Sequence, residues 1–220
     1  MKAIAAALCL AGALPVLAQP PDEMDAPTTR AGFKARNERH VSHEAMFASY
    51  ATGNRLEAGL ATATSLNIPL SPYGSDQAAA RALLCKADAV AVISVYNQRP
   101  VLAKDESFIF TEYKVEVGES IKGRLAVGER TTLARIGGAI ELPGDHITFV
   151  VPQEWPLAVG HKYLAFLRYL PATNDYTSYN VGTTYEIEPG GKLLKLVHGN
   201  KPTPDTLMSA LRDDACAGSH

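Results

Sequence analysis

The sequence lacks an excess of charge of either sign. Across 220 residues, 21 lysines and arginines stand against 23 acidic residues, and the formal net charge is −2. Proteins that bind nucleic acid or anionic membranes through electrostatics carry a clustered basic surface. We therefore expect neither nucleic acid nor an anionic membrane surface as a partner.

Long hydrophobic runs are also missing, apart from one at the start. Lys2 precedes a small and apolar stretch at 3–15, and Val16-Leu17-Ala18 fits a small-residue cleavage site. This pattern predicts a signal peptide over residues 1–18, and the run is too short for a stable membrane anchor. We expect a mature chain from Gln19 onward that is periplasmic or secreted, with no stable membrane insertion after cleavage.

Cysteine is scarce. Of three cysteines, Cys9 lies in the predicted signal peptide, which leaves Cys85 and Cys216. Two cysteines in an exported chain indicate first a disulfide, and a loop of roughly 130 residues would gain at most about 5 kcal/mol from it. The alternative is a pair of zinc-binding thiolates, which needs two further ligands, and neither cysteine has a Cys-x-x-Cys or Cys-x-x-His neighbour.

Common catalytic motifs are absent from the sequence. There is no Gly-x-Ser-x-Gly elbow, and no Lys-Ser/Thr of a phosphate-binding loop follows Gly137-Gly138. This glycine pair is better explained as a bulge or a barrel corner. We predict no catalytic, cofactor-binding or metal-binding residue from these patterns.

The histidines give no clearer signal. His40 and His43 share a helical spacing, but they do not form His-Glu-x-x-His, and we interpret them as part of a solvated helix face. His146, His161 and His198 are interpreted as surface or strand-end residues. A hydrolase remains an alternative if such histidines meet acidic residues at loop ends.

Strand patterns dominate the middle of the chain. An apolar, β-branched run extends from Cys85 to Val95, and residues 108–117 alternate so that Tyr113, Val115 and Val117 share one face. A period of two indicates a strand with one face in a core. Further short runs follow, separated by Pro143-Gly144 and by glycine and proline at 189–191. Seven to nine such strands predict a barrel or sandwich.

The predicted layout has four parts. Residues 1–18 form the signal peptide, 19–30 a disordered lead-in, 31–84 a helical N-terminal segment, and 85–216 a β-barrel domain with a C-terminal helix. These patterns indicate a mainly β fold, a barrel or a sandwich, with N-terminal helical segments and a C-terminal helix.

Two further residues attract attention. Asp88 would enter an apolar strand, and an acid there is costly unless it is paired. We predict an ion pair with Arg135. The only tryptophan, Trp155, lies in the loop 152–160. We expect this loop to lie over the barrel end, and Trp155 is a possible partner contact.

Four motifs carry a resemblance to known proteins. They are Cys85-x-Ala-Asp88-x-Val90, Phe110-Thr-x-Tyr113-x-Val115-x-Val117, Ile121-Lys-Gly123 and Arg135-x-Gly137-Gly138. In this order they resemble a group of uncharacterised exported bacterial proteins, which looks similar to netrin-like and tissue-metalloprotease-inhibitor-like modules. The resemblance covers residues 85–197 and implies that the fold is an OB-like or related antiparallel β-barrel. Such inhibitors bind an enzyme's zinc through the free amine of an N-terminal cysteine, and the internal position of Cys85 departs from that pattern.

Three hypotheses of function follow. The first is an exported, non-enzymatic binding or interaction module of the cell envelope, with an unknown protein or small ligand as partner and no cofactor. The second is an exported hydrolase whose site forms only in the folded chain. The third is an inhibitor of an envelope protease that uses the loop at 152–160. Fold alone does not choose among them.

Overall fold

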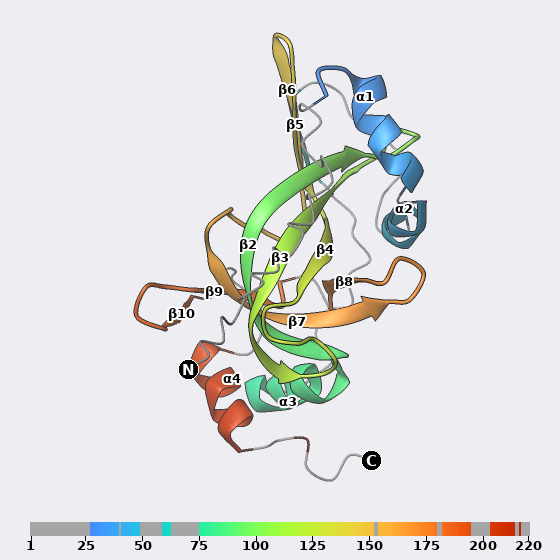
Figure 1. Cartoon of the computed structure of the whole chain (residues 1–220). Helices are drawn as coiled ribbons and strands as arrows, with labels where there is room; N and C mark the ends of the chain where they lie inside the picture. The colour runs from blue at the N-terminus through green and yellow to red at the C-terminus, as the bar shows by residue number, and fades with distance from the viewer. Residues whose placement is uncertain are drawn as a thin grey trace, which may run out of the picture.

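The computed structural model describes residues 27–39, 41–48, 59–62, 75–151, 154–179, 182–194, 203–213 and 216. Within these ranges the helical segments are α1 (Arg30–Ala35), the 3₁₀-helix η1 (Arg36–Arg39), α2 (Val41–Ala48), α3 (Asp76–Lys86) and α4 (Pro204–Arg212). The helices α3 and α4 pack against each other at one end of the molecule, and α1 and α2 lie toward the other end (Figure 1).

The strands form two sheets. They are β1 (Gly59–Thr62), β2 (Ala89–Leu102), β3 (Ile109–Lys122), β4 (Arg130–Ile136), β5 (Gly138–Leu142), β6 (Asp145–Val150), β7 (Lys162–Leu170), β8 (Asp175–Ser178), β9 (Thr184–Ile187) and β10 (Leu193–Leu194). The larger sheet has the order β10-β9-β7-β2-β3-β4-β8, and the smaller one has the order β1-β6-β5. The predicted hairpins at Pro143-Gly144 and at 189–191 are confirmed as β5–β6 and β9–β10.

The larger sheet closes into a barrel. Strand β7 pairs with both β2 and β8, so that β7, β2, β3, β4 and β8 form a ring. One pairing in the ring, β4 with β8, is parallel, and the others are antiparallel. The predicted fold class, a mainly β, OB-like barrel with helical segments and a C-terminal helix, is confirmed.

Apolar residues fill three regions. All five ring strands contribute to the barrel interior, which includes Tyr113, Val115, Leu133, Tyr163 and Tyr176. A second cluster joins the outer barrel face to α3 and α4, and a third joins the far ends of β2 and β3 to α1, α2 and the β5–β6 hairpin. The predicted alternation in β3 is confirmed, because Tyr113, Val115 and Val117 are buried while Lys114 and Glu116 are half-buried.

The disulfide between Cys85 and Cys216 is present, with a distance of 5.3 Å between the two Cα atoms. Cys85 does not open the first strand, as the sequence suggested, but lies in the last turn of α3. The helix is capped by Ser75 and continues to Lys86, and the strand β2 begins only at Ala89. The bridge therefore joins α3 to the chain just after α4.

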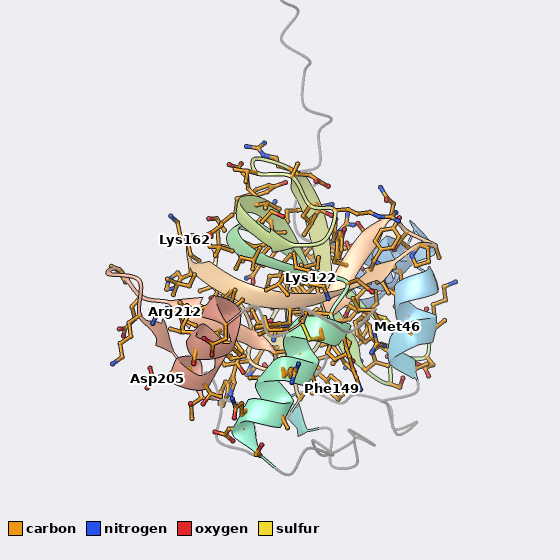
Figure 2. The ribbon with its side chains drawn as sticks, turned by 90° about the horizontal axis from the view of Figure 1, so that it is seen from below. Met46, Lys122, Phe149, Lys162, Asp205 and Arg212 are labelled. Carbon is orange, nitrogen blue, oxygen red and sulfur yellow. A yellow bond between two sulfur atoms is a disulfide. The ribbon has the colours of Figure 1, made fainter. Side chains whose placement is uncertain are left out.

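Lys122, at the end of β3, connects the barrel to α3. Its Nζ donates hydrogen bonds to the carbonyl oxygens of Leu84, Cys85 and Ala87 at 2.9, 2.8 and 2.7 Å. Carbonyls at a helix C-terminus have no partner inside the helix, and a lysine is well suited to them. Figure 2 labels Lys122 next to this helix.

The segment predicted to be helical, 31–84, contains more than helices. The strand β1 lies within it and pairs in parallel with β6, from Gly59 opposite Ile147 to Thr62 opposite Val150. A partner almost ninety residues away leaves no local pattern, so this strand could not be predicted from the sequence. The predicted signal peptide (1–18) and most of the predicted lead-in (19–30) lie outside the described residues, and α1 already begins at Arg30.

Candidate functional site

The candidate site is a pocket of about 420 Å³. It lies between the ring strands β3 and β4 and the β5–β6 hairpin, and the chain at 154–156 forms one side. Its lining is mostly apolar and includes Pro100, Ile136, Phe149 and Val151. Phe149 is labelled in Figure 2. Ligand pockets in proteins have this size range and this largely apolar character.

Gly137 and Gly138 create the pocket by turning the chain from the ring into the hairpin. Both have a positive φ, 100° and 143°. A Cβ at Gly138 would lie 2.2 Å from Thr111 Oγ1, so no other residue fits there. The hydroxyl of Thr111 donates to the Gly137 carbonyl at 2.8 Å. The glycine pair thus marks the predicted barrel corner.

A buried ion pair, Arg135 with Glu154, forms the polar part of the lining. Arg135 Nε lies 2.5 Å from Glu154 Oε1, and each side chain is 3% exposed. Burial alone would lower the pKa of Arg135, but the charge and hydrogen bond of Glu154 outweigh it and raise the pKa. Arg135 therefore carries its charge inside the protein because Glu154 balances it.

The predicted ion pair of Asp88 with Arg135 is wrong. Asp88 lies beside β7, where its Oδ2 accepts a hydrogen bond from the backbone N–H of Tyr169 at 2.9 Å. Arg135, in β4, faces the segment after β6 instead. The partner of Arg135, Glu154, follows a proline-containing loop and has no periodic pattern that could have identified it from the sequence.

Hydrogen bonds from side chains of the barrel hold the backbone of the segment from Glu154 to Ala158. Arg135 Nη1 donates to the carbonyl of Trp155 at 2.9 Å, and the hydroxyls of Tyr113 and Tyr163 accept from the N–H groups of Leu157 and Ala158 at 3.2 and 2.8 Å. Burial raises the pKa of Tyr113, and the charge of Arg135 partly offsets this. The two tyrosines stay neutral and act as fixed acceptors.

Trp155 lies at the rim of the pocket, as a side chain that lines it and is still 55% exposed. The next apolar residue in the loop, Leu157, is 2% exposed and belongs to the barrel interior. The segment is therefore anchored by Leu157 and presents Trp155 to solvent. An exposed aromatic residue on a held backbone is a typical anchor of a binding surface.

A second polar cluster lies at the other side of β3 and corrects the prediction for His43. This residue is fully buried, not part of a solvated helix face. Its Nδ1 is 3.2 Å from Glu112 Oε1, and its Nε2 is 3.3 Å from Asp175 Oδ2. Arg99 binds the other oxygen of Glu112, with Nε at 3.0 Å. The cluster ties α2 to β2, β3 and the start of β8.

The charges in this cluster determine the pKa of His43. Burial disfavours the imidazolium ion and lowers the pKa, but hydrogen bonds and charges of Asp175 and Glu112 outweigh it and raise the pKa to about 9. His43 is therefore positively charged at neutral pH. A charged histidine held by two carboxylates is neither a general base nor a metal ligand at that pH.

The remaining histidines do not form a common site. His161 Nδ1 is 2.5 Å from Glu186 Oε1, with the histidine side chain 51% exposed, and neither residue lines the pocket. His146 is exposed at the start of β6. His198 and His40 lie outside the described residues. Among the residues that the structure describes, no group of three histidine, cysteine, aspartate or glutamate side chains could hold a metal ion.

In comparisons with known proteins, the chain matches no family model and no curated sequence. Within the described ranges, no helix combines the length and the hydrophobicity that crossing a membrane requires. The function is therefore argued from the geometry of the pocket and its rim.

Proposed function

We propose that this chain is an exported, non-enzymatic binding module of the cell envelope, and that it binds through the pocket and Trp155. The observation that carries the proposal is the combination of an apolar pocket of about 420 Å³ with an exposed tryptophan on an anchored segment. The charged groups of the lining, Arg135 and Glu154, bind each other and the backbone, which suits a fixed surface better than proton transfer.

Export is part of the same proposal. It is supported by the leader pattern at 1–18 and by the disulfide, a bond that persists in oxidising compartments such as the periplasm or the extracellular space. The resemblance to netrin-like and tissue-metalloprotease-inhibitor-like modules concerns the barrel, so the choice of a binding role over an enzymatic one rests on the pocket and Trp155. The departure at Cys85 argues against an inhibitory mechanism through a free N-terminal cysteine amine, because Cys85 lies inside α3 and its nitrogen belongs to a peptide bond.

A second candidate is an inhibitor of an envelope protease. The observation that favours it is the presentation of Trp155, since protease inhibitors bind through pre-organised loops whose backbone hardly moves on binding. The hydrolase alternative has less support. Its best constellation, His161 with Glu186, is at the surface and outside the pocket.

Capture of partners from envelope extract tests the proposal. Mature chain 19–220 would be crosslinked to its partners and compared with Trp155→Ala and with Val127→Ala, which removes another exposed apolar side chain outside the pocket lining. Loss of an anchor tryptophan costs 2 kcal/mol or more, so Trp155→Ala should reduce capture by at least about tenfold. Val127→Ala should leave it unchanged.

The outcomes separate the candidates. A captured protease that the mature chain inhibits, and that Trp155→Ala no longer inhibits, supports the inhibitor. A different partner lost with Trp155→Ala supports the binding module. Equal capture by all three proteins would show that Trp155 is not part of the binding surface and would contradict the proposal.

A further inference from the structure

The polar groups of the pocket lining are almost all occupied by the protein itself. The hydroxyl of Thr111 donates to Gly137, and the hydroxyl of Tyr113 accepts from Leu157. Glu154 Oε1 accepts from Arg135 Nε and from Ser178 Oγ at 3.1 Å, and its Oε2 accepts from Gly182 N at 2.7 Å. Both oxygens of the carboxylate are therefore engaged by the protein.

The exception is the guanidinium of Arg135. Its Nε and Nη1 donate to Glu154 and to the Trp155 carbonyl, whereas Nη2 has no acceptor among the residues that the structure describes. The side chain is 3% exposed and lines the pocket. In the described part of the chain, the fully shielded side-chain atoms without a hydrogen-bond partner are Asn37 Oδ1 and Thr184 Oγ1, and Nη2 is not one of them. Nη2 is therefore a donor that the protein does not use and that an acceptor in the pocket can reach.

The charge of the pocket decides what kind of acceptor fits. Arg135 is already neutralised by Glu154, so a carboxylate or phosphate on a ligand would meet the repulsion of Glu154 at close range. A neutral acceptor avoids that cost and still gains a hydrogen bond from a charged donor, the stronger kind. The other polar side chains of the wall, Gln98 and Thr148, are exposed and half-buried, so both are hydrated at the rim.

We infer that the pocket binds a neutral, mostly apolar small molecule that carries one hydrogen-bond acceptor, a carbonyl group or an equivalent oxygen, and that Arg135 Nη2 donates to this acceptor. The apolar body of the ligand lies against Ile136, Phe149 and Val151, and Trp155 covers it at the rim. The inference rests on the proposed function and specifies the class of ligand.

The chain supplies its own reporter of binding. Trp155 is the only tryptophan, so its indole N–H gives a single, separate peak in a nitrogen–proton correlation spectrum. Mature chain would be titrated with three probes of similar shape: cyclohexyl methyl ketone, isopropylcyclohexane, which lacks the acceptor, and cyclohexanecarboxylate, which carries a charge. The shift of the Trp155 peak gives the dissociation constant of each probe.

Two variants locate the interaction. Arg135→Met combined with Glu154→Gln removes the donor without leaving a buried charge unpaired. Ala139→Phe fills the pocket from an exposed position in β5, keeps the ion pair intact and leaves Trp155 as the only tryptophan. The ratio of ketone to hydrocarbon affinity should fall by about tenfold or more in the double variant, since the hydrophobicity of the probes cancels in this comparison. Ala139→Phe should abolish the response to all probes while unfolding at the wild-type temperature.

Each outcome bears on the inference. Binding of the ketone in preference to the carboxylate, with a selectivity over the hydrocarbon that needs Arg135, supports it. Binding of the carboxylate as tightly as the ketone, or a ketone response that survives Ala139→Phe, overturns it. Absence of any probe response also overturns it, but the proposed function stands if Trp155→Ala still reduces partner capture, and both fail if it does not.

Discussion

Glu112 and His43 show how single residues depart from the local pattern of their elements. Glu112 belongs by alternation to the solvent face of β3, yet it is fully buried. Arg99, its cross-strand neighbour in β2, and His43, from α2, both bind its carboxylate. A buried carboxylate is tolerated when its hydrogen bonds and its charge are matched, and two cations achieve this here.

The protonation of His43 makes stability depend on pH. Folding raises its pKa from 6.5 to about 9. A group with a raised pKa stabilises the folded state fully below its unfolded pKa, and this stabilisation is lost as the pH rises through the folded value. The free energy of unfolding should therefore fall by up to about 3 kcal/mol between pH 6.5 and pH 9, which urea titrations at several pH values would measure.

His43→Gln serves as the control. Glutamine can keep hydrogen bonds to Glu112 and Asp175 but does not titrate, so the loss of stability over this pH range should largely disappear. The same slope in both proteins would mean that another group is responsible.

For single residues, the sequence predicts the positions that follow a periodic pattern and misses those whose partners lie far away in the chain. The buried residues of β3 follow directly from a period of two. The sequence predicts Asp88 as the ion-pair partner of Arg135, because only residues in segments with a periodic pattern can be placed near each other. The true partner, Glu154, follows a loop that has no such pattern. The opposite charges of Arg99 and Glu112 could have been found, since the two face each other in the β2–β3 hairpin. The contribution of His43 could not, because it comes from a distant helix.

At the scale of elements, the corner between β4 and β5 depends on Gly138. An alanine there would take a φ of 143°, which side chains rarely adopt, and its Cβ would lie 2.2 Å from Thr111 Oγ1. We expect Gly138→Ala to lower the free energy of unfolding by more than about 2 kcal/mol, the cost of strain plus displacement of Thr111. Urea unfolding followed by circular dichroism measures it.

Gly144 provides the matched comparison. It has a φ of 78° in the β5–β6 turn, but nothing lies within 4 Å of the position that a Cβ would occupy. Gly144→Ala should cost only the backbone strain, about 1–2 kcal/mol. If both variants lose the same stability, contact with Thr111 is not what fixes the corner.

Elements with local signals are the ones that the sequence predicts. The Pro143-Gly144 hairpin and the Ser75 cap of α3 carry turn and capping residues that need no tertiary context. The C-terminal helix is also confirmed as α4, and its N-cap is Thr203, whose side chain accepts from the backbone N–H of Thr206. The short strand β1 and the extension of α3 through Cys85 depend on contacts with distant segments, and neither is visible locally.

At the scale of the molecule, the disulfide joins α3 and the end of α4 across 131 residues of sequence. The two helices also pack through Leu83, Leu84 and Leu207, so we expect the barrel to fold without the bridge. Cys85→Ser combined with Cys216→Ser should lower the free energy of unfolding by about 2–5 kcal/mol, because the unfolded chain regains the freedom of a long loop. Denaturant unfolding of oxidised, reduced and double-variant protein checks this, and coincident transitions would contradict it.

The spacing of turn signals was enough to predict a barrel or a sandwich, but not which of the two forms or how the sheet closes. Closure depends on the parallel pairing of β4 with β8 and on the second pairing of β7, both of which join segments far apart in sequence. The pocket lies where the β5–β6 hairpin leaves the ring, so its prediction would require the closed ring first. Of the candidate site, only Trp155 and the glycine corner could be identified from the sequence.

The disulfide also turns the barrel into a covalent circle. Every ring strand, from β2 to β8, lies between Cys85 and Cys216. A protease that cuts one loop within this circle opens it but releases no fragment, because the two new ends remain joined through the bridge. A single cut, which divides an ordinary chain in two, therefore leaves all the strands of the barrel on one molecule, and only a second cut can remove any of them.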